Sequence, residues 1–398
     1  MRICLHLRIA LVLLAFQLHS PAEEVLAVKI VGNMVLVPIT LNGTVFSFLL
    51  DTGSEQSSID PKVAAHLGLA SEGTERIQKN FRDLAVDVTE IGIVHIGILS
   101  FNHVKMAEIN LAPLSQALGV NVDGVLGNDI LQALTLKVSY SRQQIFVGPL
   151  QSLGPLGKPE TLLRSGNQFL IAATFMSVPG HFVLDTGTNS TNLSWKTWEH
   201  LSQTWTPAQV VQGIQRAGNP TSSAILICLP TIKIGDVVLK DQAVRAQSKS
   251  DSGAFSAEDF DGILGSDLLQ QFEITFDLRN STAYFRPDAD YRPDPYRYVT
   301  IGIQIGKTPQ GAFEVMGVWK DSPAEEAGIQ TGDTIDEIGG KPIYSLTLDQ
   351  VSRELHAREF TIVRLRINRN SHPSTVAVRT RNLLCKPSRS RGPSTLRP

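Results

Sequence analysis

The sequence predicts a mainly β protein with two homologous, β-rich halves, followed by a smaller α+β domain. The first observation is an internal repeat, because the letters FLLDTGS at residues 48–54 return as FVLDTGT at residues 182–188. The second is that both halves consist of short segments rich in Val, Ile, Thr and Phe, separated by Gly, Asn, Asp and Pro, which is typical of strands. The third is a change of pattern after the proline-rich residues 286–295. Two copies of one folded unit explain the repeat.

Shorter signals place the elements within each half. The Asn42-Gly43 pair predicts a tight hairpin between strands at residues 35–41 and 45–50. A short helix is expected after each repeated motif, at residues 61–67 and 194–201. The letters DGVLG at residues 123–127 return as DGILG at residues 261–265, so the repeat extends well beyond the first motif.

Length and composition set the domain plan. A chain of 398 residues should hold two to four units of about 100 to 200 residues each. We expect halves at residues 23–150 and 151–290, a C-terminal domain at residues 296–384 and a disordered basic tail at residues 385–398. The 36 Lys and Arg residues nearly balance the 38 Asp and Glu residues. With a formal charge of −2, nucleic acid is not an expected partner.

Residues 1–22 are predicted to form a signal peptide. Arg2 and Arg8 precede an apolar run at residues 9–18, and small residues follow it. The run is shorter than the roughly 20 apolar residues that a spanning helix needs. We expect an exported protein, periplasmic or secreted, without an integral membrane segment after cleavage. The alternative is a short uncleaved anchor.

The cysteines are Cys4, Cys228 and Cys385. Removal of the signal peptide leaves two, in regions assigned to different domains, so we expect no structural disulfide. Cys228 lies in an apolar run and is interpreted as a small buried side chain rather than a nucleophile.

The repeated motif can supply paired carboxylates. An apolar strand leads to each aspartate, and the glycine two residues later permits a tight turn. If the two turns face each other, the carboxylates of Asp51 and Asp185 lie close together and share one proton. One aspartate can then act as base on a water molecule while the other polarises a scissile carbonyl group. The pattern therefore predicts hydrolysis of an amide.

Over residues 25–288 the chain resembles aspartic peptidases, on the motifs Asp51-Thr52-Gly53-Ser54, Asp185-Thr186-Gly187-Thr188, Val125-Leu126-Gly127 and Ile263-Leu264-Gly265. Each half is similar to bacterial retropepsin-like domains, and the whole resembles a fused pseudo-dimer. The resemblance implies a bilobal aspartic-protease fold with Asp51 and Asp185 catalytic. It also implies that Thr52 and Thr186 interlock, and that the hydroxyl groups of Ser54 and Thr188 donate to the outer carboxylate oxygens.

Two further expectations follow from this resemblance. Hydroxyl donors would lower the pKa values of the pair, so we predict an acidic optimum. Pepsin-like enzymes carry a tyrosine on the flap over the substrate, yet residues 70–95 contain none. Phe81 and the turn Gly218-Asn219-Pro220 are the flap candidates, with Phe81 as an ordinary core residue the alternative.

Four other acids are repeated in the two halves and are candidates for a metal site: Asp123, Asp129, Asp261 and Asp267. They flank glycines in turns, where aspartate commonly accepts from local backbone N–H groups. The histidines show no HExxH spacing and the chain has no Gly-x-Ser-x-Gly motif. We expect neither a metal nor a cofactor.

The C-terminal domain resembles a PDZ domain of the bacterial exported type, on the letters SPAEEAGIQTGD at residues 322–333. A helix should start at Ser322-Pro323-Ala324, a strand should cover residues 334–338, and a second helix residues 348–356. The groove would lie between that second helix and the strand Ile301, Gly302, Ile303, Gln304 and Ile305. Its open edge would accept an extended peptide. The alternative is a domain that only packs against the protease.

Together these features predict a monomeric aspartic endopeptidase whose PDZ domain recruits or senses a polypeptide substrate. One rival is a peptide-binding protein with the same fold and no turnover. Another is a homodimer, although the fused repeat already supplies both carboxylates.

Overall fold

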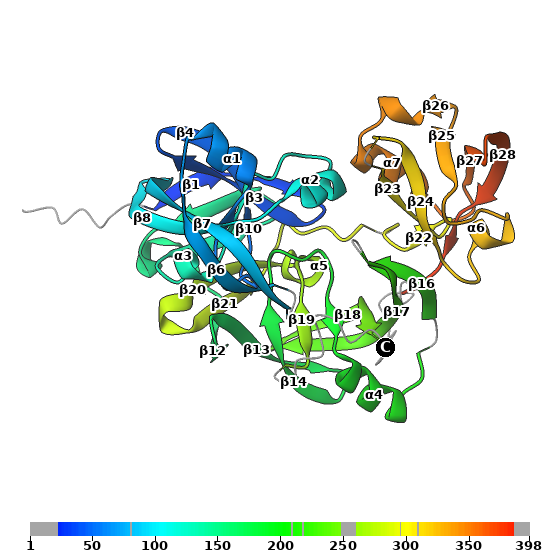
Figure 1. Ribbon diagram of the computed structural model, residues 1–398. Helices are drawn as coiled ribbons and strands as arrows, with labels where there is room; N and C mark the ends of the chain where they lie inside the picture. The colour runs from blue at the N-terminus through cyan, green and yellow to red at the C-terminus, as the bar shows by residue number, and fades with distance from the viewer. Residues whose placement is uncertain are drawn as a thin grey trace, which may run out of the picture.

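The computed structural model describes residues 23–79, 82–207, 210–216, 219–247, 260–294, 296–308 and 310–385. Four sequence predictions fall wholly or mostly outside these ranges: the signal peptide, the role of Phe81, the flap turn that begins at Gly218, and the basic tail at residues 385–398, of which only Cys385 is described. The expected class is confirmed, because the protein is mainly β, with a C-terminal unit of its own (Figure 1). In Figure 1 the first half is blue to cyan, the second is green to yellow-green, and the C-terminal unit is yellow to red.

The first lobe is an eight-stranded sheet with the order β2-β3-β4-β9-β5-β8-β7-β6. Its strands are β2 (Lys29–Val31), β3 (Met34–Leu41), β4 (Thr44–Leu50), β5 (Ser58–Ile59), β6 (Ser71–Lys79), β7 (Arg82–Ile96), β8 (Leu99–Glu108) and β9 (Gly124–Leu126). Its helices are α1 (Pro61–His66), α2 (Ala112–Leu118) and α3 (Asn128–Leu131). The predicted hairpin joins β3 to β4, and Asn42 and Gly43 both have positive φ, as a two-residue turn of this kind requires.

The second lobe repeats this plan. Its strands are β12 (Lys158–Ser165), β13 (Gln168–Phe175), β14 (Val178–Leu184), β15 (Asn192–Leu193), β16 (Val210–Arg216), β17 (Asn219–Ile234), β18 (Val237–Gln247) and β19 (Gly262–Leu264). Its helices are α4 (Trp195–Thr204) and α5 (Ser266–Leu269), with 3-10 turns η1 (Leu150–Ser152) and η3 (Leu278–Asn280) nearby. The strand order β13-β14-β19-β15-β18-β17-β16 matches that of the first lobe.

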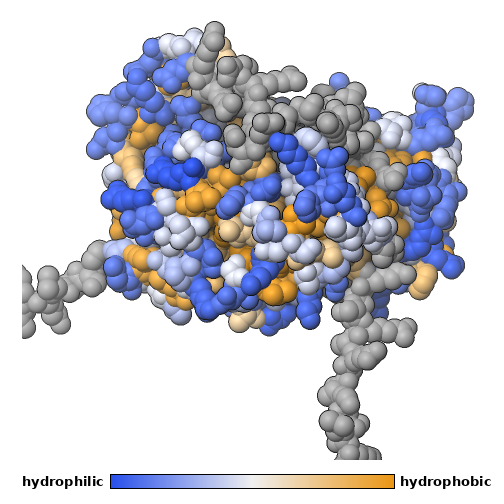
Figure 2. Space-filling view, turned by 90° about the horizontal axis from the view of Figure 1, so that it is seen from below, coloured by the Kyte–Doolittle hydropathy of each residue, from blue (hydrophilic) through white to orange (hydrophobic). Residues whose placement is uncertain are grey.

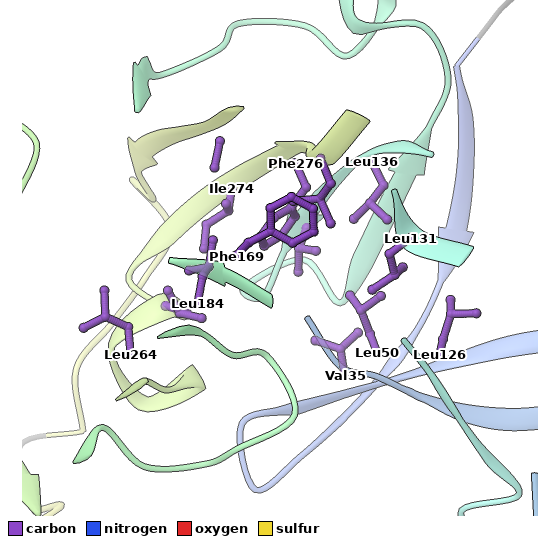
Figure 3. Packing of buried hydrophobic residues seen from close by; sticks show 14 of the residues in the cluster. Val35, Leu50, Leu126, Leu131, Leu136, Phe169, Leu184, Leu264, Ile274 and Phe276 are labelled. Carbon is purple, nitrogen blue, oxygen red and sulfur yellow. The ribbon is translucent and has the colours of Figure 1, made fainter. Parts of the chain in front are cut away.

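A shared sheet joins the two halves. It contains β1 (Glu24–Ala27), β10 (Thr135–Ser139), β11 (Gln144–Val147), β20 (Phe272–Asp277) and β21 (Thr282–Pro287). β10 pairs with β20, from Ser139 with Glu273 to Thr135 with Asp277, so strands far apart along the chain lie side by side. One buried cluster accordingly includes residues of both halves, and Figure 3 shows Leu50 and Leu136 near Phe169 and Phe276. The halves therefore hold each other in a fixed relation.

The C-terminal unit has its own sheet and its own core. Its elements are β22 (Val299–Thr300), β23 (Ile303–Lys307), β24 (Phe313–Val318), α6 (Pro323–Glu326), β25 (Thr334–Ile338), β26 (Lys341–Pro342), η4 (Ile343–Ser345), α7 (Leu348–Leu355), β27 (Ile362–Arg369), β28 (His372–Arg379) and β29 (Arg381–Asn382). Ser322 caps α6, since its Oγ accepts from the Glu325 N–H at 3.3 Å. The predicted starts of both helices and the strand at residues 334–338 are thus confirmed.

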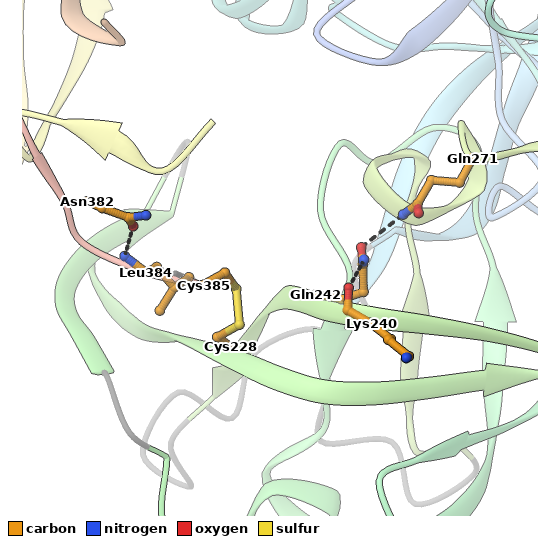
Figure 4. Close-up of a disulfide and its surroundings, with 7 residues drawn as sticks. All are labelled: Cys228, Lys240, Gln242, Gln271, Asn382, Leu384 and Cys385. Atoms are coloured by element: carbon orange, nitrogen blue, oxygen red, sulfur yellow. Dashed lines mark hydrogen bonds between the residues drawn. A yellow bond between two sulfur atoms is a disulfide. The ribbon is translucent and has the colours of Figure 1, made fainter. Parts of the chain in front are cut away.

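The prediction of no structural disulfide is wrong. Cys228, on β17, and Cys385, after the last strand, form a disulfide that closes a 157-residue separation (Figure 4). The assignment to separate domains was the source of the error, because the C-terminal segment returns from the C-terminal unit and packs on the second lobe. Leu384 and Cys385 contact Val211, Leu226 and Cys228 within one cluster.

None of the helices in the described ranges is both long and apolar enough to cross a membrane. On the face that Figure 2 shows, hydrophobic residues lie in small groups between hydrophilic ones.

Candidate active site

Two equivalent strands deliver the aspartates. β4 ends at Leu50 and β14 ends at Leu184, and each runs parallel to the strand of the second repeated motif, β9 or β19. The Asp51 N–H donates to the Leu126 carbonyl oxygen at 3.1 Å, and the Asp185 N–H donates to that of Leu264 at the same distance. The apolar pair before each Gly in the second motif therefore fixes the backbone of the aspartate.

The glycines show that the two turns face each other. A Cβ atom added to Gly53 would lie 2.3 Å from Asp185 Cγ, and one added to Gly187 would lie 2.2 Å from Asp51 Cγ. Real Cβ atoms do not approach other atoms so closely. Each glycine N–H also donates to the aspartate of its own turn, at 2.9 Å for Gly53 and 2.8 Å for Gly187. Each carboxylate thus packs against the glycine of the opposite lobe.

Thr52 and Thr186 interlock across the two lobes. The Thr52 hydroxyl donates to the Leu184 carbonyl oxygen at 2.6 Å, and the Thr186 hydroxyl donates to that of Leu50 at 2.7 Å. Each threonine Oγ1 also accepts from the N–H of the other threonine at 3.1 Å. Both threonines are buried, at 1% and 0% exposure. These four bonds hold the turns in register, as the resemblance implied.

The electrostatics of the pair are unequal. Burial raises the pKa of Asp51, while hydrogen bonds from the Gly53 N–H and with Asp185 oppose this rise. Burial and then the charge of Asp51 raise the pKa of Asp185 well above its ordinary value. Two carboxyl groups in such contact hold one proton between them over a wide pH range. Of the two rises in pKa, the one at Asp185 is the larger.

The prediction that the Ser54 hydroxyl donates to the carboxylate of Asp51 is wrong. The Ser54 Oγ donates to the Gln56 carbonyl oxygen at 2.9 Å instead of to Asp51. Backbone N–H groups of Ser54 and Thr188 interact with the aspartates in place of the side chain of Ser54. They lower both pKa values, but burial outweighs them, so the pKa values of the pair are raised rather than lowered.

The four other repeated acids accept from backbone and hydroxyl groups, but their donors are not only the local ones that were expected, because each acid also accepts from a residue more than 70 positions away. Asp123 Oδ2 accepts from the Ser47 N–H at 2.8 Å, and Asp261 Oδ2 accepts from the His181 N–H at 2.7 Å. Asp129 Oδ1 accepts from the Ser57 hydroxyl at 2.6 Å, and Asp267 Oδ1 accepts from the Thr191 hydroxyl at 2.7 Å. No group of three or more metal-ligating side chains occurs in the described part of the chain.

Sequence reasoning missed two buried residues that support the motif from behind. The Asn128 Nδ2 donates to the Thr52 carbonyl oxygen at 2.8 Å, and the Ser266 Oγ donates to that of Thr186 at 2.9 Å. The same Nδ2 also reaches the carbonyl oxygen of Asn167, from the other lobe, at 2.8 Å. The available signal was positional, because Asn128 and Ser266 both directly follow the glycine of the second repeated motif.

The flap candidates stay untested. Phe81 and Gly218 lie outside the described residues, and Asn219 is described only as backbone at the start of β17. Each lobe carries one long hairpin at the corresponding place, β6–β7 in the first and β16–β17 in the second.

The predicted groove residues of the C-terminal unit divide into two groups. Ile301 and Ile303 are buried in its core, at 0% and 6% exposure, so their side chains do not line an open groove. The strand begins at Ile303 instead of Ile301, since the Ile301 carbonyl oxygen accepts from Ala324 and Gly302 bends the chain. Gln304 and Ile305 are half-buried. β23 lies at the end of its sheet, where β24 is its only described strand partner.

Comparisons with known proteins agree with this division of the chain. A family model described as aspartyl protease matches residues 37–130 and 171–268, one segment in each lobe. A family model described as PDZ domain matches residues 314–369, within the C-terminal unit.

Curated relatives cover a smaller part of the chain. A probable CtpA-like serine protease of Staphylococcus haemolyticus (strain JCSC1435) is 34% identical over 82 residues, which are 21% of this chain and 16% of the relative. One of Staphylococcus aureus (strain COL) is 33% identical over 89 residues, 22% of this chain and 18% of the relative. The chain therefore spans less than a fifth of the length of these bacterial relatives. The serine protease activity in their names refers to those proteins.

Proposed function

We propose that this chain, which carries an aspartyl protease domain in two matched segments and a C-terminal PDZ domain, is an endopeptidase that uses Asp51 and Asp185 to activate one water molecule. The observation that carries the proposal is the reciprocal packing of each aspartate against the glycine of the opposite lobe. Because four threonine bonds hold the two turns, the carboxylates keep this relation without rearrangement when substrate binds.

The larger rise in the pKa of Asp185 supports the following division of roles. Asp51, the charged member, accepts a proton from water as the water oxygen bonds to the scissile carbonyl carbon. Asp185, the protonated member, gives its proton to the carbonyl oxygen. When the tetrahedral intermediate collapses, the C–N bond breaks and the leaving nitrogen takes the proton from Asp51. The proton on the former carbonyl oxygen returns to Asp185, so the pair is restored.

The PDZ domain is proposed to hold an extended part of the same polypeptide. β23 is an edge strand, and an edge strand can add one further strand through its unpaired backbone groups. Gln304 and Ile305 are the members of this strand that we assign to the groove. Both lie on the only segment of the predicted groove that is not fully buried.

We also propose export to an oxidising compartment, the periplasm or the exterior. The disulfide between Cys228 and Cys385 supports this location, because such bonds persist where thiols are not kept reduced. A single chain supplies both aspartates, so we propose that the monomer is active.

The pH profile tests the proposed function. Activity requires the singly protonated pair, so the rate should rise with pH through the lower apparent pKa of the pair and fall through the upper one. Both pKa values are raised, which moves this window from strongly acidic pH toward neutrality. The measurement is kcat/KM for an unfolded protein substrate between pH 3 and about pH 9. A rate that increases steadily up to the highest pH, as for a single histidine base, would contradict the shared proton.

A further inference from the structure

We propose that Arg297, which lies just before β22, the first strand of the PDZ domain, is a positioning residue for the Asp185 half of the catalytic site, so that docking of the PDZ domain sets the activity of the protease. This inference rests on the proposed function. The two protease lobes share one plan but differ in what neutralises one buried carboxylate.

The difference lies at Asp129 and Asp267, which occupy the same position in the two halves. Asp267 is 4% exposed, and its Oδ2 lies 3.7 Å from an Nη atom of Arg297. Among the described residues, no lysine or arginine forms an ion pair with Asp129. The second lobe therefore holds a buried carboxylate whose neutralising charge comes from outside the lobe. A buried charge without such a partner is costly, so the contact with Arg297 matters for this loop.

A short chain of hydrogen bonds connects Asp267 to Asp185. Asp267 Oδ1 accepts from the Thr191 hydroxyl at 2.7 Å, and the Oγ1 of Thr191 accepts from the Gly265 N–H at 3.1 Å. Gly265 follows Leu264, whose carbonyl oxygen accepts from the Asp185 N–H.

The next residue after Gly265 makes a second connection to the catalytic turn. The Ser266 Oγ donates to the Thr186 carbonyl oxygen at 2.9 Å, and the Ser266 N–H donates to that of Thr188 at 2.8 Å. A shift of Asp267 would thus move the segment that holds the backbone on both sides of Asp185.

Contacts with Tyr298 and the cluster around it hold Arg297 in place. The guanidinium group lies over the ring of the next residue, Tyr298, at 5.4 Å from the ring centre. The Tyr298 carbonyl oxygen accepts from the Leu383 N–H at 2.9 Å, and Tyr298 packs in the cluster that contains the disulfide. The bond between Cys228 and Cys385 ties this cluster to the second lobe (Figure 4).

A cavity of about 160 Å³ lies beside this contact, lined by Asp267 and Arg297 together with Gln304 and Trp319 of the PDZ domain. Gln304 belongs to β23, the strand assigned to the peptide groove. The groove strand and the residue that supports the catalytic loop therefore border the same space. A peptide added to β23 has a direct physical route to the contact between Arg297 and Asp267.

The test compares Arg297→Ala and Arg297→Lys with a matched control, Arg292→Ala. Arg292 lies five residues earlier, in the proline-rich segment, and its guanidinium group donates to the nearby carbonyl oxygens of Ala289 and Tyr291. We expect Arg297→Ala to lower kcat roughly 3- to 30-fold, as for residues that couple two sites, with KM nearly unchanged. Arg297→Lys should restore part of kcat, and Arg292→Ala should match the wild type.

Amide hydrogen exchange gives a readout that does not depend on proteolysis. Arg297→Ala, and separately Cys228→Ser with Cys385→Ser, should raise exchange in peptides covering residues 185–193 and 262–268. The corresponding peptides of the first lobe, residues 51–59 and 124–130, should not change. Unchanged exchange in the second-lobe peptides would overturn the inference, as would an equal rise in both lobes. If the exchange pattern is as expected while no variant cleaves substrate, the connection stands and the proposed function fails.

Discussion

Replacement of either aspartate by asparagine is expected to reduce the cleavage of an unfolded protein by about 10⁴-fold, the upper range for loss of a general acid or base. In Asp51→Asn the amide cannot accept the proton of the attacking water. In Asp185→Asn the amide has no acidic proton to give to the carbonyl oxygen. The measurement is the initial rate of each variant at the optimum pH of the wild type, with Asp336→Asn, an exposed position on β25, as the matched control.

Measurement of thermal stability distinguishes a loss of catalytic activity from misfolding. An aspartate whose pKa is higher in the folded protein stabilises the fold at pH below its unfolded pKa. That contribution is lost as the pH rises through its folded pKa. Because the pKa of Asp185 is raised, the aspartate destabilises the fold near neutral pH, and asparagine removes this penalty. The Tm of Asp185→Asn at pH 7 should therefore equal or exceed that of the wild type. Folded variants that keep activity within tenfold of the wild type would contradict the assignment.

Alanine at Gly187 or Gly53 is also expected to lower the rate of cleavage, by a smaller factor than the loss of an aspartate. At Gly187 the new Cβ would lie 2.2 Å from Asp51 Cγ, whereas ordinary contacts begin at 3.4 Å. The carboxylate must move by about 1 Å, and a displacement of this size costs on the order of 100-fold in rate. Overpacking should also lower the free energy of unfolding by about 1–3 kcal/mol. Rates and denaturant unfolding curves measure both effects.

Gly92→Ala is the matched control for this prediction. Gly92 lies in β7, and a Cβ there would have Asn42 Oδ1 as its nearest contact, at 3.5 Å. The Gly92→Ala variant should therefore cleave the substrate at nearly the wild-type rate. An active Gly187→Ala variant would mean that the two turns do not face each other as described.

Much of this site was open to prediction because the repeat restricts the interpretation. Asp-Thr-Gly occurs twice after an apolar strand, and a second apolar-apolar-Gly motif follows each copy at a similar distance. Such a pattern fixes backbone geometry, and backbone geometry fixes where the Asp, Thr and Gly residues point. The two lobes follow from these motifs, and the resemblance that the motifs carry implied the threonine interlock.

The remaining features depend on distances that no local pattern encodes. The Ser54 hydroxyl group donates to the Gln56 carbonyl oxygen, and its direction depends on one side-chain rotamer. The rise in the two pKa values depends on how much protein surrounds the pair. The disulfide and the contact between Arg297 and Asp267 arise only because the C-terminal segment packs on the second lobe. Sequence spacing gave no indication of that return.

One carboxyl group of the catalytic pair is proposed to keep its proton at a pH where ordinary aspartates have lost theirs. A diazo ester tests it directly, because such reagents esterify a carboxyl group only in its protonated form. At about pH 6, ordinary aspartates, with a pKa near 3.9, are almost fully ionised. Peptide mapping by mass spectrometry should find one ester per chain, on Asp185, and activity should fall in proportion to its formation. Scattered esters with no preference for Asp185, or full activity after complete modification of Asp185, would contradict the shared proton.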